Sequence, residues 1–374
     1  MVNTRNRQFS AFLQRHIDSG DFPSAVYLVA ENDRTIFSDA LGYSVVTPNR
    51  LTSNTGTIYD LASLTKPLIT GFLCARLIEL GELTLDSSVS HYLPEFERTD
   101  KQAITIRELL THSSGLSAWR PLYVLAEGDP ERAVSAIASL DLEYKPGARV
   151  VYSDLGFITL GILLERLCGH RLNELAVREL IEPLQLSKTF FNPAASLQTS
   201  IAACETGNRY ERATCEQMGI KDYGSWRQDT IWGKVHDGNA YFLRGAAGHA
   251  GLFSTADETF KLAQQFLPQC SALLKPDTCE LFRTNMTQGL EEARSLGWQL
   301  AQTKDSTAGN ALPPDSFGHT GFTGTSCWID PHSQRVFILL TNRTHARSLP
   351  FANLNAVRRE FHRLAVAALD AQVA

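Results

Sequence analysis

The chain has 374 residues, of which 43% are hydrophobic and 20% charged, and its formal net charge is −5. This length and composition fit a globular protein with one large domain or two closely joined domains. A mildly acidic chain without basic tracts gives no reason to expect nucleic acid or an anionic membrane as a partner. No segment is apolar for long enough to span a bilayer, and the polar N-terminus lacks the apolar core of a signal peptide.

The seven cysteines are an odd number, and their spacing matches neither a zinc site nor a redox pair. Cys204 and Cys215 could pair in an oxidising compartment. A reducing cytoplasm fits the set better, because disulfides do not persist there and most of these residues are expected to be buried apolar groups. We therefore expect a cytoplasmic protein.

The first elements are a helix and a hairpin. Phe9, Phe12, Leu13 and Ile17 recur at helical spacing, which predicts an amphipathic helix over residues 6–19. Strands are predicted from Ala25 to Ala30 and from Thr35 to Ser38, joined by a turn at Asn32-Asp33.

The middle of the chain reads as mostly helical. Helices are predicted from about Ser63 to Leu80, from Ile106 to Thr111 and from Leu155 to Leu167, the last one buried and stopped by Gly169. Residues 196–251 are rich in Gly, Asn and Asp and have weak periodicity, so they are predicted to form long loops.

The C-terminal end mirrors the beginning. Strands are predicted over residues 325–330 and from Arg335 to Thr341, and a closing helix carries Phe351 through Leu364. We therefore predict one sheet domain from residues 1–60 plus 285–374. Residues 61–284 would be a mostly helical region inserted into it.

The most informative short motif is Ser63-Leu64-Thr65-Lys66. Residues three apart share a helix face, so the hydroxyl and the amine would be neighbours. Pro67 is tolerated only near the first turn, which places Ser63 at the positive end of the helix dipole. A lysine desolvated in a cleft can lose its proton near neutral pH and activate a serine. On its own the motif also fits an ordinary helix start with a solvated lysine.

Two further segments bear on this choice. Tyr152-Ser153-Asp154 precedes the buried helix, where Ser153 or Asp154 can cap it; alone, this is a core tyrosine beside a routine cap. His319-Thr320-Gly321 precedes the C-terminal strands, and its glycine permits a backbone to approach a ligand closely. Alone, that segment is a glycine-rich turn.

Together the three segments resemble the serine β-lactamase and DD-peptidase superfamily, most closely its class C β-lactamase and serine-esterase branch. That family carries Ser-x-x-Lys, then Tyr-x-Asn, then Lys-Thr-Gly or His-x-Gly in this order. The resemblance runs from about residue 8 to 370 and includes residues 105–116 and 248–255. It implies an α+β fold of the β-lactamase/transpeptidase type. An antiparallel sheet is flanked by the terminal helices, and the active cleft lies between it and the helical insert.

The resemblance also implies roles for individual residues. Ser63 would attack the substrate carbonyl and become acylated, while Lys66 and Tyr152 share the general-base work. The backbone N–H groups of Ser63 and Phe322 would form the oxyanion hole. His319, with Thr320 and Gly321, would lie beside the pocket and orient the substrate. The family needs neither cofactor nor metal.

Two positions depart from the family pattern. Asp154 replaces an asparagine, and a carboxylate cannot donate the amide hydrogen bond to a substrate. His319 replaces a lysine and supplies less positive charge at pH 7. Both changes disfavour substrates with a free carboxylate. Asp154 could instead be a helix cap with no effect on the substrate.

Other signals are assigned structural roles. His112 is expected to be a satisfied structural histidine at a helix end. His236, Asp237 and His249 do not have the spacing of a metal site, and their loops are expected to border the cleft. Trp119, Trp226 and Trp232 could line an apolar pocket, but packing is the role expected by default. Motifs of α/β-hydrolases, zinc proteases, P-loops and dinucleotide folds are absent.

The sequence therefore predicts a serine hydrolase that acts on a small-molecule ester or peptide, with esters favoured and little or no β-lactamase activity. The alternatives are a D-amino-acid peptidase or amidase, a β-lactamase, and a penicillin-binding or sensing protein that is acylated without turnover. Oligomeric state is left open.

Overall fold

A seven-stranded antiparallel sheet is the centre of the computed structural model, which describes residues 4–221 and 223–373. The order of its strands is β3-β2-β1-β9-β8-β7-β6, so strands from the two ends of the chain meet in its middle, where β1 pairs with β9. The strands are β1 (Ser24–Glu31), β2 (Arg34–Val45), β3 (Leu51–Thr52), β6 (Gln299–Leu300), β7 (Phe317–Thr320), β8 (Ser326–Asp330) and β9 (Arg335–Thr341).

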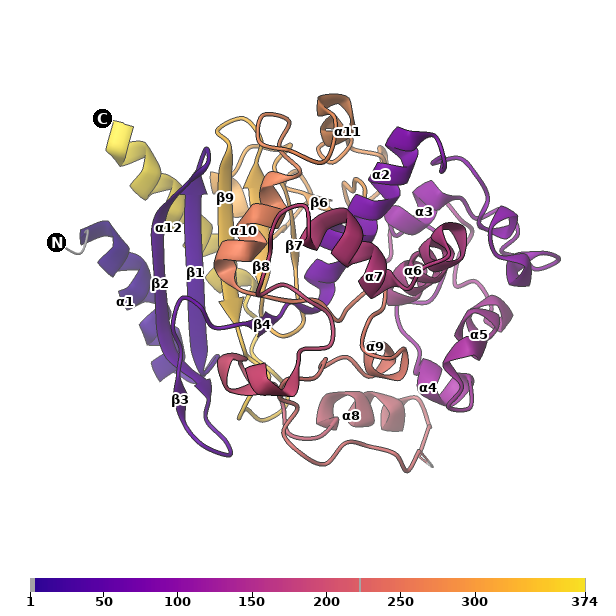
Figure 1. The fold of residues 1–374 in the computed structure, drawn as a ribbon, viewed down its shortest axis with the longest axis horizontal. Helices are drawn as coiled ribbons and strands as arrows, with labels where there is room; N and C mark the ends of the chain where they lie inside the picture. The colour runs from indigo at the N-terminus through magenta and orange to yellow at the C-terminus, as the bar shows by residue number, and fades with distance from the viewer. Residues whose placement is uncertain (1–3, 222, 374) are drawn as a thin grey trace.

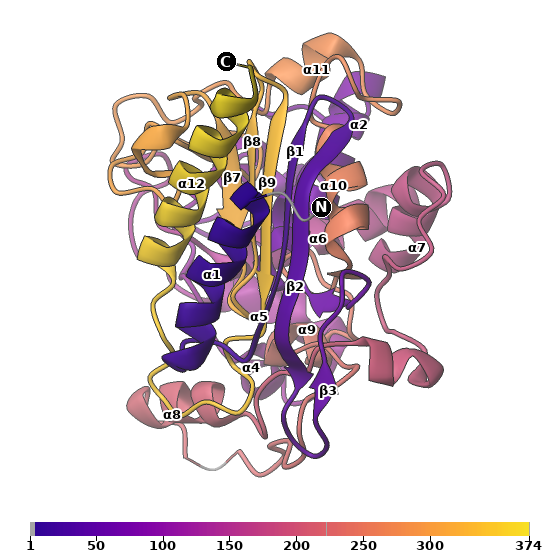
Figure 2. The ribbon, with the colours of Figure 1, turned by 90° about the vertical axis from the view of Figure 1, so that its left-hand side faces the viewer.

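The two terminal helices cover one face of this sheet. Helices α1 (Thr4–Asp18) and α12 (Asn355–Val373) lie side by side across it (Figure 2). Because side chains alternate along a strand, Tyr27 and Val29 of β1 point to this face and pack with Phe9 and Phe361. The burial of these large apolar groups fixes both ends of the chain on the sheet.

The opposite face carries the main core. Val26 and Leu28 of β1 pack there into one cluster that includes Phe72 of α2 (Phe72–Leu80) and Phe157 of α6 (Asp154–Cys168). Helix α10 (Ala256–Gln264) lies against β1 and β9 on this face (Figure 1). Sheet and helical region thus share one continuous core.

The remaining helices surround this core. They are α3 (Ile106–Leu110), α4 (Leu122–Leu125), α5 (Ala133–Ser139), α7 (Leu172–Ala176), α8 (Arg209–Gln217), α9 (Gly238–Phe242) and α11 (Pro276–Glu280). Strands β4 (Tyr59–Asp60) and β5 (Phe253–Ser254) form a separate two-stranded sheet. Among the described helices, none combines the length and the apolar character needed to cross a membrane.

The α+β fold class, the terminal helices and the paired end strands are confirmed. The helix predicted from about Ser63 to Leu80 is present, but it starts as a 3₁₀ turn (Ala62–Leu64), continues as a π-helix (Lys66–Gly71) and becomes α2. The loops predicted over 196–251 are partly wrong, because α8, α9 and a 3₁₀ helix (Ala195–Ser200) lie there. Helix α8 was missed because it is almost entirely polar and has only two buried residues, Glu211 and Cys215.

Two further predictions concern the cysteines and the division into domains. All seven cysteines are unpaired, so the bridge considered between Cys204 and Cys215 is not formed. The division into residues 1–60 plus 285–374 and an insert of 61–284 stays a prediction.

Candidate active site

Ser63 lies on a strained turn at the start of the 3₁₀ helix. The preceding residue, Ala62, has a φ of 48°, in the left-handed region that residues other than glycine rarely adopt. The buried carboxylate of Asp60 holds this turn by accepting a hydrogen bond from the backbone N–H of Ala62 at 2.8 Å. Since the first N–H groups of a helix have no partner within it, the N–H of Ser63 is available to a ligand.

Lys66 lies one helical turn from Ser63, and its ammonium nitrogen is buried among oxygen atoms. Its Nζ donates to Ser63 Oγ at 3.0 Å and to the backbone carbonyl of His249 at 3.2 Å, and lies 2.7 Å from Asp154 Oδ1. Burial lowers the pKa of Lys66, but Asp154 and Tyr152 outweigh that effect, so the pKa is raised. The expectation that desolvation would release its proton near neutral pH is therefore wrong, because it did not foresee a carboxylate in contact.

Tyr152 approaches the same pair from the segment just before α6. Its ring centre is 4.7 Å from Lys66 Nζ, and its hydroxyl lies near Lys66 and Ser63, which both act on its pKa. Burial raises the pKa of Tyr152 and the nearby Lys66 lowers it, with a net rise. Three residues from distant parts of the sequence, Ser63, Lys66 and Tyr152, thus converge at one point.

The first residues of α6 determine which group the carboxylate of Asp154 contacts. Ser153 caps the helix, because its Oγ accepts a hydrogen bond from the backbone N–H of Gly156 at 3.1 Å. The carboxylate of Asp154 is turned to Lys66 and does not serve as the cap. Of the two readings of Asp154, the helix cap is wrong, and contact with a substrate stays a prediction.

His112 packs against Tyr152, but it is not the fully satisfied histidine that was expected, because its buried Nε2 has no hydrogen-bond partner among the described residues. Its ring lies 4.5 Å from the ring of Tyr152, and its Nδ1 accepts a hydrogen bond from the backbone N–H of Ser153 at 3.0 Å. Burial holds the pKa of His112 well below its usual range, so the ring is neutral.

The edge of β7 forms the opposite wall. His319 Nδ1 lies 2.8 Å from the carbonyl of Thr320, which can only accept, so Nδ1 carries the proton and Nε2 is the free acceptor. Burial, together with the nearby Lys66 and Arg294, holds the pKa of His319 well below its usual range. This histidine is therefore neutral, as expected for a residue in place of the family's lysine.

Gly321 brings the β7 wall against the turn of Ser63. A Cβ at this position would lie 2.5 Å from the carbonyl oxygen of Leu61, so only glycine allows this approach. Arg343 Nε donates to the carbonyl of Phe322 at 2.7 Å, and among the described residues none accepts a hydrogen bond from the N–H of Phe322. An oxyanion hole formed by Ser63 and Phe322 stays a prediction that this backbone geometry allows.

These groups line a cleft of about 760 Å³ between β7 and the helical region. The predicted residues Ser63, Tyr152, Asp154, His319, Thr320, Gly321 and Phe322 line it, and His236, Asp237 and Trp119 border it as well. The packing role expected for Trp119 is thus incomplete. Lys66 lies buried behind Ser63.

Sequence reasoning missed several charged residues of the cleft, among them Arg294 and Glu211. Arg294, whose charge centre is 5.9 Å from the ring of Tyr152, comes from a loop without a motif and is held by Glu292 at 2.9 Å. Glu211 lies on α8, in a region predicted as loop; burial and the nearby Asp237 raise its pKa to about 7. Neither residue had a local pattern that could have revealed it.

One group of side chains could in principle approach a cation. The nearest ligand atoms of Asp154, Asp237 and His249 lie within 4.8 Å of one another. The charged nitrogen of Lys66 already pairs with Asp154, and His249 Nε2 lies 2.8 Å from Asp237 Oδ1. Lysine and histidine nitrogens thus serve the two carboxylates, and the donor set does not call for a metal ion.

Known proteins are similar to this chain over most of its length. A family model described as Beta-lactamase matches residues 9–359. The chain is 30% identical over 371 residues, 91% of its length and 83% of the relative's, to a protein of Escherichia coli (strain K12) named "Putative D-alanyl-D-alanine carboxypeptidase". It is 31% identical to the N-acetylmuramyl-L-alanine amidase of Bacillus subtilis (strain 168), covering 92% of the chain and 84% of the relative.

Solved structures share the fold. EstCE1, a hydrolase with promiscuous acyltransferase activity, superposes with a TM-score of 0.74 at 23% identity, over 96% of this chain and 98% of that one. A class C beta-lactamase superposes with a TM-score of 0.74 at 17% identity, over 98% and 96% of the two chains. With the family match over nearly its whole length, the chain belongs to the beta-lactamase family, in the superfamily of serine β-lactamases and DD-peptidases, and is a serine hydrolase.

Proposed function

We propose that this protein hydrolyses small esters through an acyl-enzyme formed on Ser63. The observation that carries the proposal is the contact of the Ser63 hydroxyl with both Lys66, at 3.0 Å, and Tyr152. A serine hydroxyl is a weak nucleophile unless neighbouring groups accept its proton as it attacks. Lys66 and Tyr152 are the groups within reach.

The reaction would proceed in two halves. Ser63 Oγ attacks the substrate carbonyl carbon while its proton leaves by way of Tyr152 beside the Lys66 ammonium ion, and the N–H groups of Ser63 and Phe322 bind the developing oxyanion. The bond to the leaving group then breaks, and that group departs with the proton. Water attacks the acyl-enzyme in the second half, and the same residues move its proton to Ser63.

The preference for substrates without a free carboxylate rests on the charge around Ser63. Asp154 is a carboxylate at the floor of the cleft, and the neutral His319 occupies the place of the family's lysine. Arg343 and Arg358 also line the cleft, but Arg343 donates to backbone carbonyls, that of Phe322 among them, and Arg358 donates to the carbonyl of Thr325 and the side chain of Asn355. Because Asp154 is paired with Lys66, the support for this preference is the neutral His319, which leaves a substrate carboxylate without the charged partner that the family's lysine would supply.

An amidase or peptidase of D-amino-acid or cell-wall-derived peptides is the second candidate. Two relatives at 30% and 31% identity carry the names of a carboxypeptidase and an amidase. The same acyl-enzyme chemistry would cleave the amide bond, with an amine as the leaving group.

The test compares short p-nitrophenyl esters, a D-alanyl p-nitroanilide and nitrocefin as substrates of the wild-type protein and of Ser63→Ala. We expect steady release of p-nitrophenol that falls at least 1,000-fold in Ser63→Ala. Ser139→Ala, which changes an exposed serine on α5, should leave the rate unchanged. Faster turnover of the anilide would favour the second candidate, and a burst without a steady rate would favour a sensing protein. Full ester activity in Ser63→Ala would refute the site.

The proposal also includes a cytoplasmic location, for which the seven unpaired cysteines are the support. Detection of this protein in the cytoplasmic fraction of source cells would support this location, and its absence from that fraction would contradict it.

A further inference from the structure

We propose that His236 is a positioning residue that braces both halves of the oxyanion hole proposed for Ser63 and Phe322, and that the buried carboxylate of Glu205 holds His236 in place. The proposal rests on the proposed function, since it takes the backbone N–H groups of Ser63 and Phe322 as the donors to the oxyanion. His236 acts through the two segments that carry these donors.

The backbone of His236 reaches the first half of the hole. Its N–H donates to Asp60 Oδ2 at 2.7 Å, and the other oxygen of this carboxylate accepts the N–H of Ala62 at 2.8 Å. Asp60 is buried, so it satisfies both donors where water does not reach them. Because Ala62 immediately precedes Ser63 and has the left-handed φ of 48°, this one carboxylate ties His236 to the conformation of the serine turn.

The ring of His236 reaches the second half. It stacks on the ring of Phe322, with the ring centres 5.5 Å apart and the planes inclined by 23°. The residue after Phe322, Thr323, donates from its Oγ1 to the carbonyl of Asp60 at 2.7 Å. His236 and Asp60 thus contact the segment of each donor, and together they set the spacing of the two N–H groups.

Glu205 fixes the orientation of this ring. Its Oε1 lies 2.9 Å from His236 Nε2, and the side chains of His236 and Glu205 are 5% and 0% exposed. A carboxylate oxygen can only accept a hydrogen bond, so Nε2 carries a proton. Burial lowers the pKa of His236, but the hydrogen bond and the charge of Glu205 outweigh that effect, and the pKa is raised. With Nε2 bound to Glu205 and one face on Phe322, the ring is held in one orientation.

Stability alone does not account for this buried pair. Removing two charged groups from water costs free energy that their attraction only partly offsets, so apolar side chains of similar size are often as stable at such a site. The backbone around the ring is already held, because Arg227 donates to the carbonyls of Val235 and His236. The pair adds a fixed orientation of one aromatic ring against Phe322, which an aliphatic side chain would not provide.

The test measures kcat and KM for p-nitrophenyl acetate, and the inhibition constant of phenylboronic acid, in the wild type and in His236→Gln. Glutamine keeps an N–H for Glu205 but has no ring to stack on Phe322. An oxyanion donor acts in the transition state, so we expect kcat and kcat/KM to fall together by about 10- to 100-fold while KM stays within about threefold. The inhibition constant should rise by a similar factor, because the tetrahedral boronate formed on Ser63 places an oxygen in the hole.

Two variants of Glu205 test whether this residue acts through His236. Glu205→Ala frees the ring, so we expect a loss of kcat close to that of His236→Gln, and the double variant should lose no more than His236→Gln alone. Glu205→Gln keeps an acceptor for Nε2 and should retain kcat within about threefold of the wild type. The matched control is His362→Gln, because His362 is also buried but lies outside the lining of the cleft. It should keep wild-type kinetics.

Several outcomes would overturn the proposal. They are wild-type kcat in His236→Gln, a change confined to KM, and an equal loss in His362→Gln, while additive losses in the double variant would refute the role of Glu205. If His236→Gln does not melt cooperatively, Glu205→Ala decides: a lowered kcat at unchanged KM supports the proposal, and wild-type kinetics refute it. An active Ser63→Ala would refute the proposed function itself, whereas unchanged kinetics of His236→Gln beside an inactive Ser63→Ala refute only the role of His236.

Discussion

Ser63 directly follows a residue whose backbone conformation is unusual. Ala62 holds a left-handed φ of 48° and Asp60 fixes it with a buried carboxylate. On the other side, Thr325 Oγ1 donates to the carbonyl of Leu61 at 2.9 Å, which ties the segment after β7 to the same turn. A strained backbone conformation persists only where the surrounding structure enforces it, and such residues cluster at active sites.

Gly321 is the position at which this arrangement is most sensitive to a single methyl group. In Gly321→Ala, the Cβ would lie 2.1 Å from Thr325 Oγ1 and 2.5 Å from the carbonyl of Leu61, so the β7 wall must move away from Ser63. We expect kcat/KM to fall about 100-fold, the scale of losing an oxyanion donor, and stability to fall by about 1–3 kcal/mol.

Gly224→Ala is the matched control, because a Cβ there meets nothing within 4 Å. Enzyme assays and urea unfolding of the two variants measure both effects. Normal activity in Gly321→Ala would mean that the β7 wall does not contribute to the reaction.

At the scale of elements, the N-terminus of α6 affects both the stability of the fold and the geometry of the active site. The cap residue Ser153 lies between Tyr152 and Asp154, so one helix start positions two of the groups around Lys66. A change in how this helix begins therefore alters the chemistry as well as the fold.

Ser153→Ala tests this connection. It removes the hydrogen bonds to the N–H of Gly156 and the carbonyl of Ser117, and we expect a loss of about 1–2 kcal/mol in the free energy of unfolding. Because Tyr152 and Asp154 are released with the cap, we expect kcat/KM to fall at least tenfold.

Thr255→Ala is the comparison for this variant, since Thr255 caps α10 through the N–H of Glu258, outside the lining of the cleft. It should lose similar stability and keep its activity. Equal activity loss in both variants would show that destabilisation alone explains the effect of Ser153→Ala.

At the scale of the whole molecule, buried histidines make folding sensitive to mild acid. His362 of α12 is fully buried, its Nδ1 lies 2.9 Å from the carbonyl of Thr307, and burial lowers its pKa to about 4. The unfolded chain, with a histidine pKa of about 6.5, therefore takes up a proton before the folded chain does as the pH falls. His362 stabilises the fold above about pH 6.5, and this contribution is lost progressively as the pH falls toward 4.

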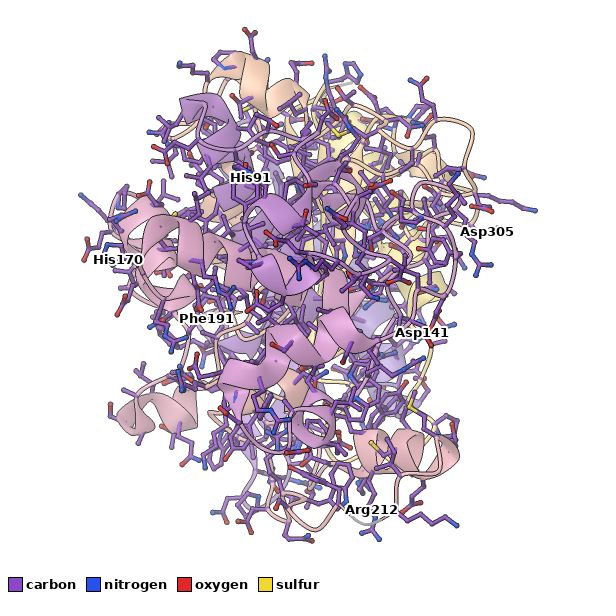
Figure 3. The ribbon with its side chains drawn as sticks, turned by 90° about the vertical axis from the view of Figure 1, so that its right-hand side faces the viewer. His91, Asp141, His170, Phe191, Arg212 and Asp305 are labelled. Carbon is purple, nitrogen blue, oxygen red and sulfur yellow. The ribbon has the colours of Figure 1, made fainter. Side chains whose placement is uncertain are left out.

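His112, His319 and His345 act in the same direction, whereas His236, whose pKa is raised by Glu205 against the effect of burial, acts in the opposite one. In His362→Asn we expect the fall in unfolding free energy between pH 6 and pH 5 to be smaller by up to about 1.4 kcal/mol than in the wild type. Urea unfolding at both pH values measures this difference. His91→Asn, at an exposed position labelled in Figure 3, should keep the wild-type slope, and an identical slope in His362→Asn would contradict the prediction.

Much of the fold could be predicted because local periodicity is strong where elements are buried. The strand β1, the pair β8 and β9 and the buried helix α6 follow the expected pattern of apolar residues, whereas β2, predicted from Thr35 to Ser38, runs over Arg34–Val45 and is mostly exposed or half-exposed. Helix α8 could not be predicted this way, since it is a polar helix over the cleft, and nothing in its own sequence indicates where Glu211 will lie.

The sequence by itself predicted the identity and order of the candidate reactive groups: a serine and a lysine three residues apart, a tyrosine before a buried helix, and a glycine-rich edge beside a histidine. It could do so because the three segments in this order resemble one family, although each segment alone fits an ordinary structural role. Only the tertiary structure decided that the carboxylate of Asp154 meets the amine of Lys66, because this contact of 2.7 Å joins residues 88 positions apart. Burial and charge pairing act through space, so no local pattern in the chain contains them.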